Sequence, residues 1–138
     1  MTEQKTCLVV DDSDIIREIA ARIAADLGLA TEQAENATDA VALCQDKTID
    51  VVLLDWDLPS MGALDFLRGA AELPEDGKPK VILCATENDP QQFTLAKAAG
   101  AAHYVLKPFD RNAIEIAFVE AGIIDPGKSE QTTSSTTS

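Results

Sequence analysis

Short apolar runs alternate along the chain with stretches in which apolar residues recur at a helical spacing. This alternation is typical of repeated strand–helix units whose strands form a parallel sheet. Three of the five apolar runs are almost continuously apolar, as expected of strands covered on both faces. The predicted strands are residues 7–10, 30–34, 51–54, 80–84 and 102–106.

The segments that separate or follow these strands predict five helices. In the first, Ile15, Ile19, Ile23 and Leu27 recur every four residues, which indicates the apolar face of an amphipathic helix that is closed by Gly28. The other helices are predicted at residues 38–45, 64–71, 90–99 and 112–121, with Asn36 and either Asp89 or Asp110 as N-terminal caps.

Composition limits the size of the protein and its surroundings. With 138 residues, of which 46% are apolar and 25% charged, the chain suits one globular domain with a sizeable core. A formal net charge of −13 argues against binding to nucleic acid or to an anionic membrane surface. The sequence contains no apolar run of membrane-spanning length and no signal peptide pattern, so we expect a cytoplasmic protein.

The cysteines and the single histidine do not form a metal or catalytic motif. Cys7, Cys44 and Cys84 lack a metal-ligand spacing and are predicted to be small buried thiols. His103 has no cysteine or histidine near it in sequence and is predicted to open a strand or to lie at the surface. Neither a zinc site nor a Ser-His-Asp triad is indicated.

The composition changes after Ile124. Residues 125–138 are rich in Ser and Thr and offer almost no apolar surface. We therefore expect one domain over residues 1–124 and a disordered tail over residues 125–138.

Acidic side chains gather where the predicted strands end. Asp11 and Asp12 follow the first strand, and Asp55 and Asp57 follow the third. In an open parallel sheet, ligands bind at the carboxyl ends of the strands, next to the point where the strand order reverses. If the first and third strands are neighbours, the carboxylates converge at one edge. Because crowded carboxylates are costly, this arrangement predicts a cation there.

Magnesium fits this donor set, because it takes a few hard oxygen ligands and keeps water or phosphate oxygens in its other positions. Asp11, Asp12 and Asp55 would supply the ligands. A carboxylate can attack phosphorus to form an acyl phosphate when the metal and an ammonium group neutralise the transferred charge. Lys107, at the end of the fifth strand, is the candidate ammonium, and Thr86 after the fourth strand offers a hydroxyl.

The same residues stand in motifs that resemble a known family. The motifs "VVDDS", "LLDWDLP", "AGA" and "KPF" follow the order and spacing of the receiver domain of two-component response regulators, over roughly residues 5–123. Among receivers, the sequence is most similar to the stand-alone CheY-like type. The resemblance implies an α/β fold, a doubly wound five-stranded parallel sheet of the flavodoxin-like (βα)5 type with strand order 2-1-3-4-5.

The resemblance also implies roles for individual residues. Asp55 matches the phosphoacceptor, and Asp11 and Asp12 match the acidic pair that holds Mg²⁺. Lys107 matches the lysine that pairs with the phosphoryl group. Asp57 matches a position whose main-chain carbonyl ligates the metal and whose side chain faces the site. Two further positions are implied: Tyr104 matches the aromatic switch residue, and the peptide bond before Pro108 is usually cis in the family.

Two positions depart from the family pattern. Ala85 stands where receivers usually have Ser or Thr, so a bulge would be needed to bring the hydroxyl of Thr86 inward as a switch. After Asp55, residues 61–63 read "MGA" where "MDG" is usual, which predicts a different turn in that loop.

The resemblance implies a monomeric single-domain response regulator that takes phosphate from a histidine kinase or phosphotransfer protein onto Asp55. It would catalyse only its own phosphoryl transfer and dephosphorylation. It would bind a downstream protein through the face near the fourth and fifth strands, for example in chemotaxis. Two alternatives stay open. A pseudo-receiver is favoured by Ala85, whereas a magnesium phosphatase of the haloacid dehalogenase type would have its acceptor after the first strand.

Overall fold

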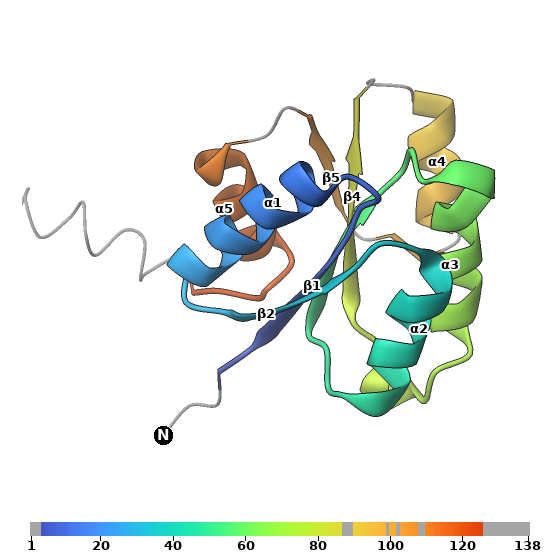
Figure 1. The fold of residues 1–138 in the computed structure, drawn as a ribbon, viewed down its shortest axis with the longest axis horizontal. Coiled ribbons are helices and arrows are strands. Elements are labelled where there is room, and N and C mark those ends of the chain that lie inside the picture. The colour runs from blue at the N-terminus through green and yellow to red at the C-terminus, as the bar shows by residue number, and fades with distance from the viewer. Residues whose placement is uncertain (1–3, 87–89, 99, 102, 108–109, 126–138) are drawn as a thin grey trace, which may run out of the picture.

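The computed structural model describes residues 4–86, 90–98, 100–101, 103–107 and 110–125. Five parallel strands form one sheet in the order β2-β1-β3-β4-β5 (Figure 1). This order confirms the predicted doubly wound α/β architecture. The strands are β1 (Thr6–Val10), β2 (Ala30–Ala34), β3 (Val51–Asp55), β4 (Lys80–Ala85) and β5 (His103–Leu106).

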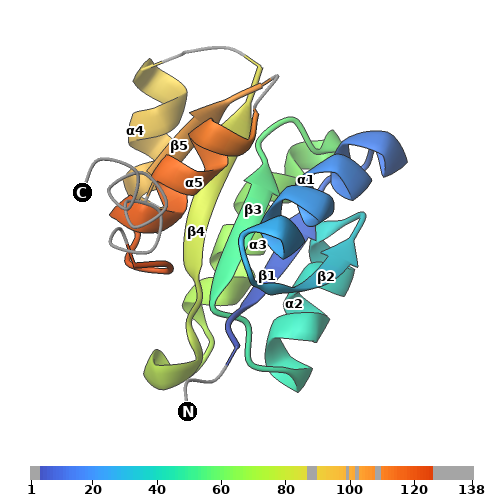
Figure 2. The same ribbon diagram turned by 90° about the vertical axis from the view of Figure 1, so that its left-hand side faces the viewer.

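Helices cover both faces of the sheet. The first and last helices lie on one face and the other three on the opposite face (Figures 1 and 2). The observed bounds lie within two residues of the predicted ones, and those of β2 are the same as predicted. Residue 99, the predicted last residue of the fourth helix, and residue 102, the predicted first residue of the fifth strand, lie outside the described residues. The helices are α1 (Asp14–Asp26), α2 (Ala37–Asp46), α3 (Gly62–Ala71), α4 (Pro90–Ala98) and α5 (Arg111–Glu120), with short 3-10 turns η1 (Pro59–Met61) and η2 (Glu75–Gly77).

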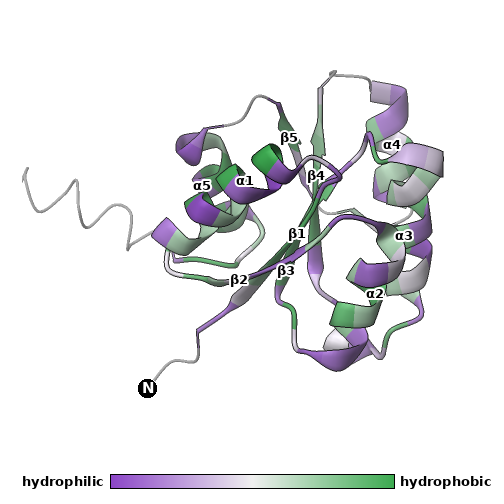
Figure 3. Cartoon of the chain, in the orientation of Figure 1, coloured by the Kyte–Doolittle hydropathy of each residue, from purple (hydrophilic) through white to green (hydrophobic). Residues whose placement is uncertain are grey.

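Each face of the sheet buries its own apolar cluster, because alternate residues of a strand point to opposite sides. Leu8 of β1 belongs to the cluster beneath α2 and α3, which contains Phe66. Val9 belongs to the cluster beneath α1 and α5, which contains Phe118. Figure 3 shows the apolar strands between helices whose outer surfaces are largely polar. β3 is buried along its whole length, which holds its carboxyl end firmly in place.

Capping side chains account for where three helices begin. Asn36 and Asp110 each accept a hydrogen bond from the main-chain N–H three residues later, at 2.8 and 2.9 Å, which confirms both as caps. Ser13 caps α1 in the same way at 3.3 Å, so this helix begins at Asp14. Asp89, the other candidate cap, lies outside the described residues.

The buried face of α1 differs from the predicted one. Ile15 and Ile19 are 71% and 46% exposed, whereas Ala20, Ala21 and Ala24 are buried against the sheet. A four-residue step overshoots one helical turn by about 40°, so apolar residues at that spacing drift around the helix. The interpretation of Ile15 and Ile19 as part of the core face was therefore wrong.

The three cysteines are free and buried, as predicted. Burial raises the pKa of Cys44 to about 11 and that of Cys84 to about 12, and it raises the pKa of Cys7 still further. These thiols are therefore packing residues. His103 opens β5, as predicted. No helix within the described ranges has both the length and the apolar character needed to cross a membrane.

Candidate metal centre

The sheet brings the predicted acidic residues together at one edge. Asp55 is the last residue of β3, and Asp11 directly follows β1, the neighbouring strand. Oxygens of Asp11, Asp12 and Asp55 lie within 4.8 Å of one another. Throughout the described part of the chain, no other group of three acidic, histidine or cysteine side chains is placed in this way.

Two of these three carboxylates are deeply buried. Asp11 is 4% exposed and Asp55 is 3% exposed, and no other polar residue in the described ranges is as buried. Asp12, in contrast, is exposed at the rim. Because an isolated buried carboxylate is costly, Asp11 and Asp55 require positively charged or hydrogen-bonding partners.

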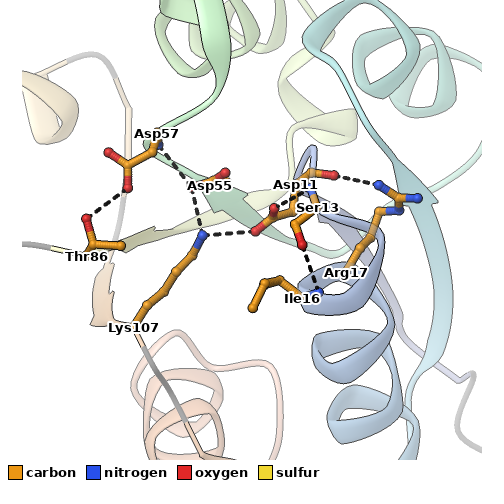
Figure 4. Close-up of polar contacts among 8 residues, drawn as sticks. All are labelled: Asp11, Ser13, Ile16, Arg17, Asp55, Asp57, Thr86 and Lys107. Atoms are coloured by element: carbon orange, nitrogen blue, oxygen red, sulfur yellow. Dashed lines mark hydrogen bonds and ion pairs between the residues drawn. The ribbon is translucent and has the colours of Figure 1, made fainter.

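Lys107 provides such a partner for both. Its main-chain N–H donates to the carbonyl of Ala85 at 2.7 Å, which extends the pairing of β4 and β5 by one residue. Its Nζ lies 2.9 Å from Oδ1 of Asp55 and 3.0 Å from Oδ2 of Asp11 (Figure 4). One ammonium group therefore bridges two buried carboxylates from different strands.

Burial and this bridge shift the pKa of both partners. Burial raises the pKa of Asp55 above its usual value, against the opposing effect of the hydrogen bonds from Lys107 and Asp57. Burial alone would lower the pKa of Lys107, but its hydrogen bonds to Asp55 and Asp11 outweigh this and raise it. Lys107 therefore remains positively charged at neutral pH.

Main-chain N–H groups in the following turns also hold the buried carboxylates. The N–H of Ser13 donates to Oδ1 of Asp11 at 2.9 Å, and the N–H of Asp57 donates to Oδ1 of Asp55 at 3.0 Å. Both Lys107 and Asp57 thus bind the same oxygen of Asp55. Neither of these two hydrogen bonds involves the other oxygen of Asp55, Oδ2.

The hydroxyl of Thr86 contacts the loop after β3. Thr86 is exposed, and its Oγ1 donates to Oδ2 of Asp57 at 3.3 Å (Figure 4). Ala85, 2% exposed, is paired with Leu106 at the end of a regular register, without a bulge. The strand therefore ends on a buried methyl group at the position where the resemblance led us to expect a hydroxyl, and Thr86 lies beyond the strand end.

Tyr104 lies on β5 and packs against α4. Its ring meets that of Phe93 edge to face, with the ring centroids 5.0 Å apart. The side chain is half-buried. The peptide bond before Pro108 lies outside the described residues.

The loop after β3 carries two residues in the left-handed region. Ser60 and Met61 have φ values of 56° and 58°, whereas Gly62 has a helical φ of −58°. A Cβ on Gly62 would lie 3.0 Å from the Cβ of Leu58, a tight contact that glycine avoids. This loop thus has positive φ values at Ser60 and Met61, which carry side chains, and not at its glycine.

Two residues around the centre were not identified from the sequence. Ser13 binds Asp11 through its main chain, and Arg17 donates from Nη1 to the main-chain carbonyl of Asp11 at 2.7 Å (Figure 4). The sequence feature that could have identified Arg17 is its place one turn into the helix that follows the acidic residues at the end of β1.

Comparison with known proteins identifies relatives of the chain. Residues 7–118 match the response regulator receiver domain. The chemotaxis protein CheY of Pseudomonas aeruginosa is 29% identical over 109 residues, which cover 78% of this chain and 88% of that protein. The chemotaxis protein CheY-3 of Vibrio cholerae is 30% identical over 103 residues, covering 74% and 79%.

Solved structures agree with these sequence matches. The chemotaxis response regulator CheY4 of Vibrio cholerae superposes with a TM-score of 0.79 at 25% identity, covering 86% of this chain and 98% of that one. A response regulator from Thermotoga maritima gives a TM-score of 0.74 at 26% identity, covering 88% and 98%.

Proposed function

Because the chain belongs to the response regulator receiver domain family, we propose that Asp55 accepts a phosphoryl group with the help of Mg²⁺. The main support is the bridge that Lys107 forms between Asp55 and Asp11. It combines a buried carboxylate with a fixed positive charge, as transfer of a phosphoryl group to a carboxylate requires. Receiver domains are signalling modules, so the proposed reaction modifies the protein itself.

The donor set fits the proposed metal. Asp11, Asp12 and Asp55 offer carboxylate oxygens, which suit Mg²⁺ better than softer metals. The main-chain carbonyl of Asp57 would be a further ligand, as in the family. When bound, the metal would supply positive charge to the phosphoryl oxygens.

The residues of the chain have separate tasks in this transfer. An oxygen of Asp55 forms a bond to phosphorus while the phosphorus–nitrogen bond of a phosphohistidine donor breaks and the nitrogen keeps the electron pair. The raised pKa of Lys107 keeps its ammonium protonated, so that it can neutralise the transferred group. Burial of Asp55 limits the access of water to the acyl phosphate.

The proposed donor is a histidine kinase or a phosphotransfer protein. Its imidazole must reach Asp55, so its surface must rest on the rim around the carboxylates. Asp12 lies on this rim, and the exposed Ile15 and Ile19 lie along the adjoining turns of α1. Exposed isoleucines one turn apart suit contact with an apolar protein surface.

The proposed output is binding of a downstream protein at the groove between α4, β5 and α5. The groove is lined partly by Phe93, Tyr104 and the exposed side chains of Leu106 and Ile116. Chemotaxis is the proposed pathway, since several relatives are chemotaxis proteins. The net charge of −13 supports a protein partner rather than nucleic acid.

We further propose a cytoplasmic monomer whose folded domain is residues 1–124. The apolar clusters and all described strands and helices lie within that range. Residues 126–138 lie outside the described residues, so the disordered tail expected over residues 125–138 stays a proposal.

A pseudo-receiver is the second candidate function. Ala85 favours it, because phosphorylation could not recruit a hydroxyl from that position. In that case the groove would bind its partner regardless of the state of Asp55. Family membership and the acceptor candidate on β3 argue against a haloacid dehalogenase phosphatase.

Labelling with a small phosphodonor and Mg²⁺ tests the proposal. Intact mass spectrometry should detect one added phosphoryl group that hydroxylamine removes, and Asp55→Asn should abolish it. Asp57→Asn is the matched control, since it removes a neighbouring exposed carboxylate and should remain labelled. Labelling of Asp55→Asn to the wild-type extent would reject Asp55 as the acceptor.

A further inference from the structure

Arg17 connects three segments that meet beside the acidic residues. Its side chain is only 14% exposed, although it lies in the second turn of a surface helix. Nη1 donates to the carbonyl of Asp11 at 2.7 Å, Nε donates to Oε1 of Gln33 on β2 at 3.1 Å, and Nη2 pairs with Asp14. The guanidinium therefore joins α1, β2 and the turn after β1.

Every polar atom of Asp11 has a partner. Its N–H donates to the carbonyl of Ala34 at 3.2 Å, and its two side-chain oxygens accept hydrogen bonds from Ser13 and Lys107. Arg17 binds the last of these atoms, the main-chain carbonyl. That carbonyl belongs to the planar peptide unit that leads into Asp12, so its direction determines where the backbone of Asp12 begins.

Asp12 is held less firmly by the surrounding structure than Asp11. It is exposed, and its carboxylate oxygen nevertheless lies within 4.8 Å of those of Asp11 and Asp55. The strand ends at Val10, so regular pairing with β3 does not extend to Asp12. The peptide unit fixed by Arg17 is the nearest rigid element before it.

We infer that Arg17 is a positioning residue for the cation site: by holding the carbonyl of Asp11, it directs the carboxylate of Asp12 toward the other two. This inference rests on the proposed Mg²⁺ site. In this role Arg17 favours cation binding, whereas its positive charge alone would repel a cation and weaken binding.

These two effects predict changes of opposite sign in Mg²⁺ affinity. If Arg17 acted only through its charge, Arg17→Met would tighten Mg²⁺ binding. If it orients the peptide unit, Arg17→Met should weaken binding by roughly tenfold, the size of effect that outer partners of metal ligands commonly have. A purely structural role would lower the melting temperature without changing the dissociation constant.

The test is a Mg²⁺ titration of the purified full chain, followed by the fluorescence of Trp56. This is the single tryptophan, and it directly follows Asp55. Arg22→Met is the matched control, because Arg22 is an exposed arginine on the same helix. We expect wild type and Arg22→Met to bind alike and Arg17→Met to bind about tenfold more weakly.

The outcomes separate this inference from the proposed site. If wild type does not bind Mg²⁺, the proposed cation site is wrong and the inference falls with it. If wild type and Arg17→Met bind equally, or the variant binds more tightly, only the inference on Arg17 is overturned. Should Arg17→Met not fold, Arg17→Lys decides: a shorter, unforked side chain cannot keep all three contacts, so weaker binding supports the inference and unchanged binding rejects it.

Discussion

The carboxyl edge of the sheet has two regions that differ in how tightly they are held. The acidic cluster (Asp11, Asp12, Asp55 and Lys107) has two buried carboxylates bridged by one ammonium. The residues proposed as a switch (Ala85, Thr86 and Tyr104), called the switch region below, have a buried methyl group, an exposed hydroxyl and a half-buried ring. The hydroxyl contacts Asp57 rather than Asp55.

This difference indicates that the proposed chemistry and its transmission depend on separate residues. Three of the groups proposed for phosphoryl transfer, Asp11, Asp55 and Lys107, are joined by charged hydrogen bonds of 2.9 and 3.0 Å at the ends of β1, β3 and β5. The groups proposed to transmit a structural change to α4 and β5 are joined mainly by packing, such as that of Tyr104 on Phe93. Substitutions in the acidic cluster should therefore strongly affect labelling of Asp55. Those in the switch region should affect the structural response to labelling.

Replacing Lys107 should have the largest effect. Among the described residues, Lys107 is the only cation paired with the carboxylates of Asp11 and Asp55, and Lys107→Met removes it. We expect labelling of Asp55 to slow by roughly 10²–10³-fold, as when a preorganised charge partner of a transition state is lost. Lys47→Met, which breaks an exposed ion pair with Glu32, is the control and should label normally. Equal rates in the two variants would remove Lys107 from the proposed mechanism.

Binding of Mg²⁺ should produce the next largest effect. A ligand that binds only the folded state at 100 times its dissociation constant stabilises that state by about 2.7 kcal/mol. The melting temperature should therefore rise with Mg²⁺ concentration. The same titration of Asp12→Ala should give little rise, because one of the three carboxylates is missing. An equal rise in both proteins would contradict the proposed ligand set.

The pH dependence of stability should reveal the cost of burying Asp55. Burial raises the pKa of Asp55 in the folded state above its unfolded value. The contribution of Asp55 to stability is therefore fully present below the unfolded pKa and is lost as the pH rises through the folded pKa. In the absence of metal, Asp55→Asn should melt a few degrees higher than wild type at pH 7. The difference should shrink as the pH falls through the folded pKa and should be closed at the unfolded pKa of about 4. A lower melting temperature for the variant at pH 7 would mean that the bond to Lys107 outweighs burial.

Substitutions in the switch region should have the smallest effects on labelling. Ala85→Thr should change the labelling rate by no more than a few-fold, about the size of one modest hydrogen bond. It should enlarge the chemical-shift change at Tyr104 on addition of beryllofluoride and Mg²⁺, because a hydroxyl at this position can follow the phosphoryl group. Thr86→Ala should reduce that change if Thr86 leaves Asp57 for the phosphoryl group. If neither variant alters the shift change, the switch does not use a hydroxyl at the end of β4.

The fold and the acidic cluster could be predicted from the sequence because they follow from one geometric rule. A parallel sheet brings the carboxyl ends of its strands to one edge, so Asp11, Asp55 and Lys107 were expected to meet, and they do. The core face of α1 could not be predicted, because its small alanines give a weaker signal than Ile15 and Ile19. The contacts of Thr86 and Arg17 depend on loop paths and side-chain reach, which no periodicity encodes.

A crystal structure with Mg²⁺ and beryllofluoride would show whether Asp55 is the phosphoacceptor and whether the three clustered carboxylates hold the metal. We expect beryllofluoride on a carboxylate oxygen of Asp55, within hydrogen-bond distance of Lys107, and a metal ion bound by Asp11, Asp12 and Asp55. Beryllofluoride on another carboxylate, or a metal ion away from these three residues, would contradict the proposed site.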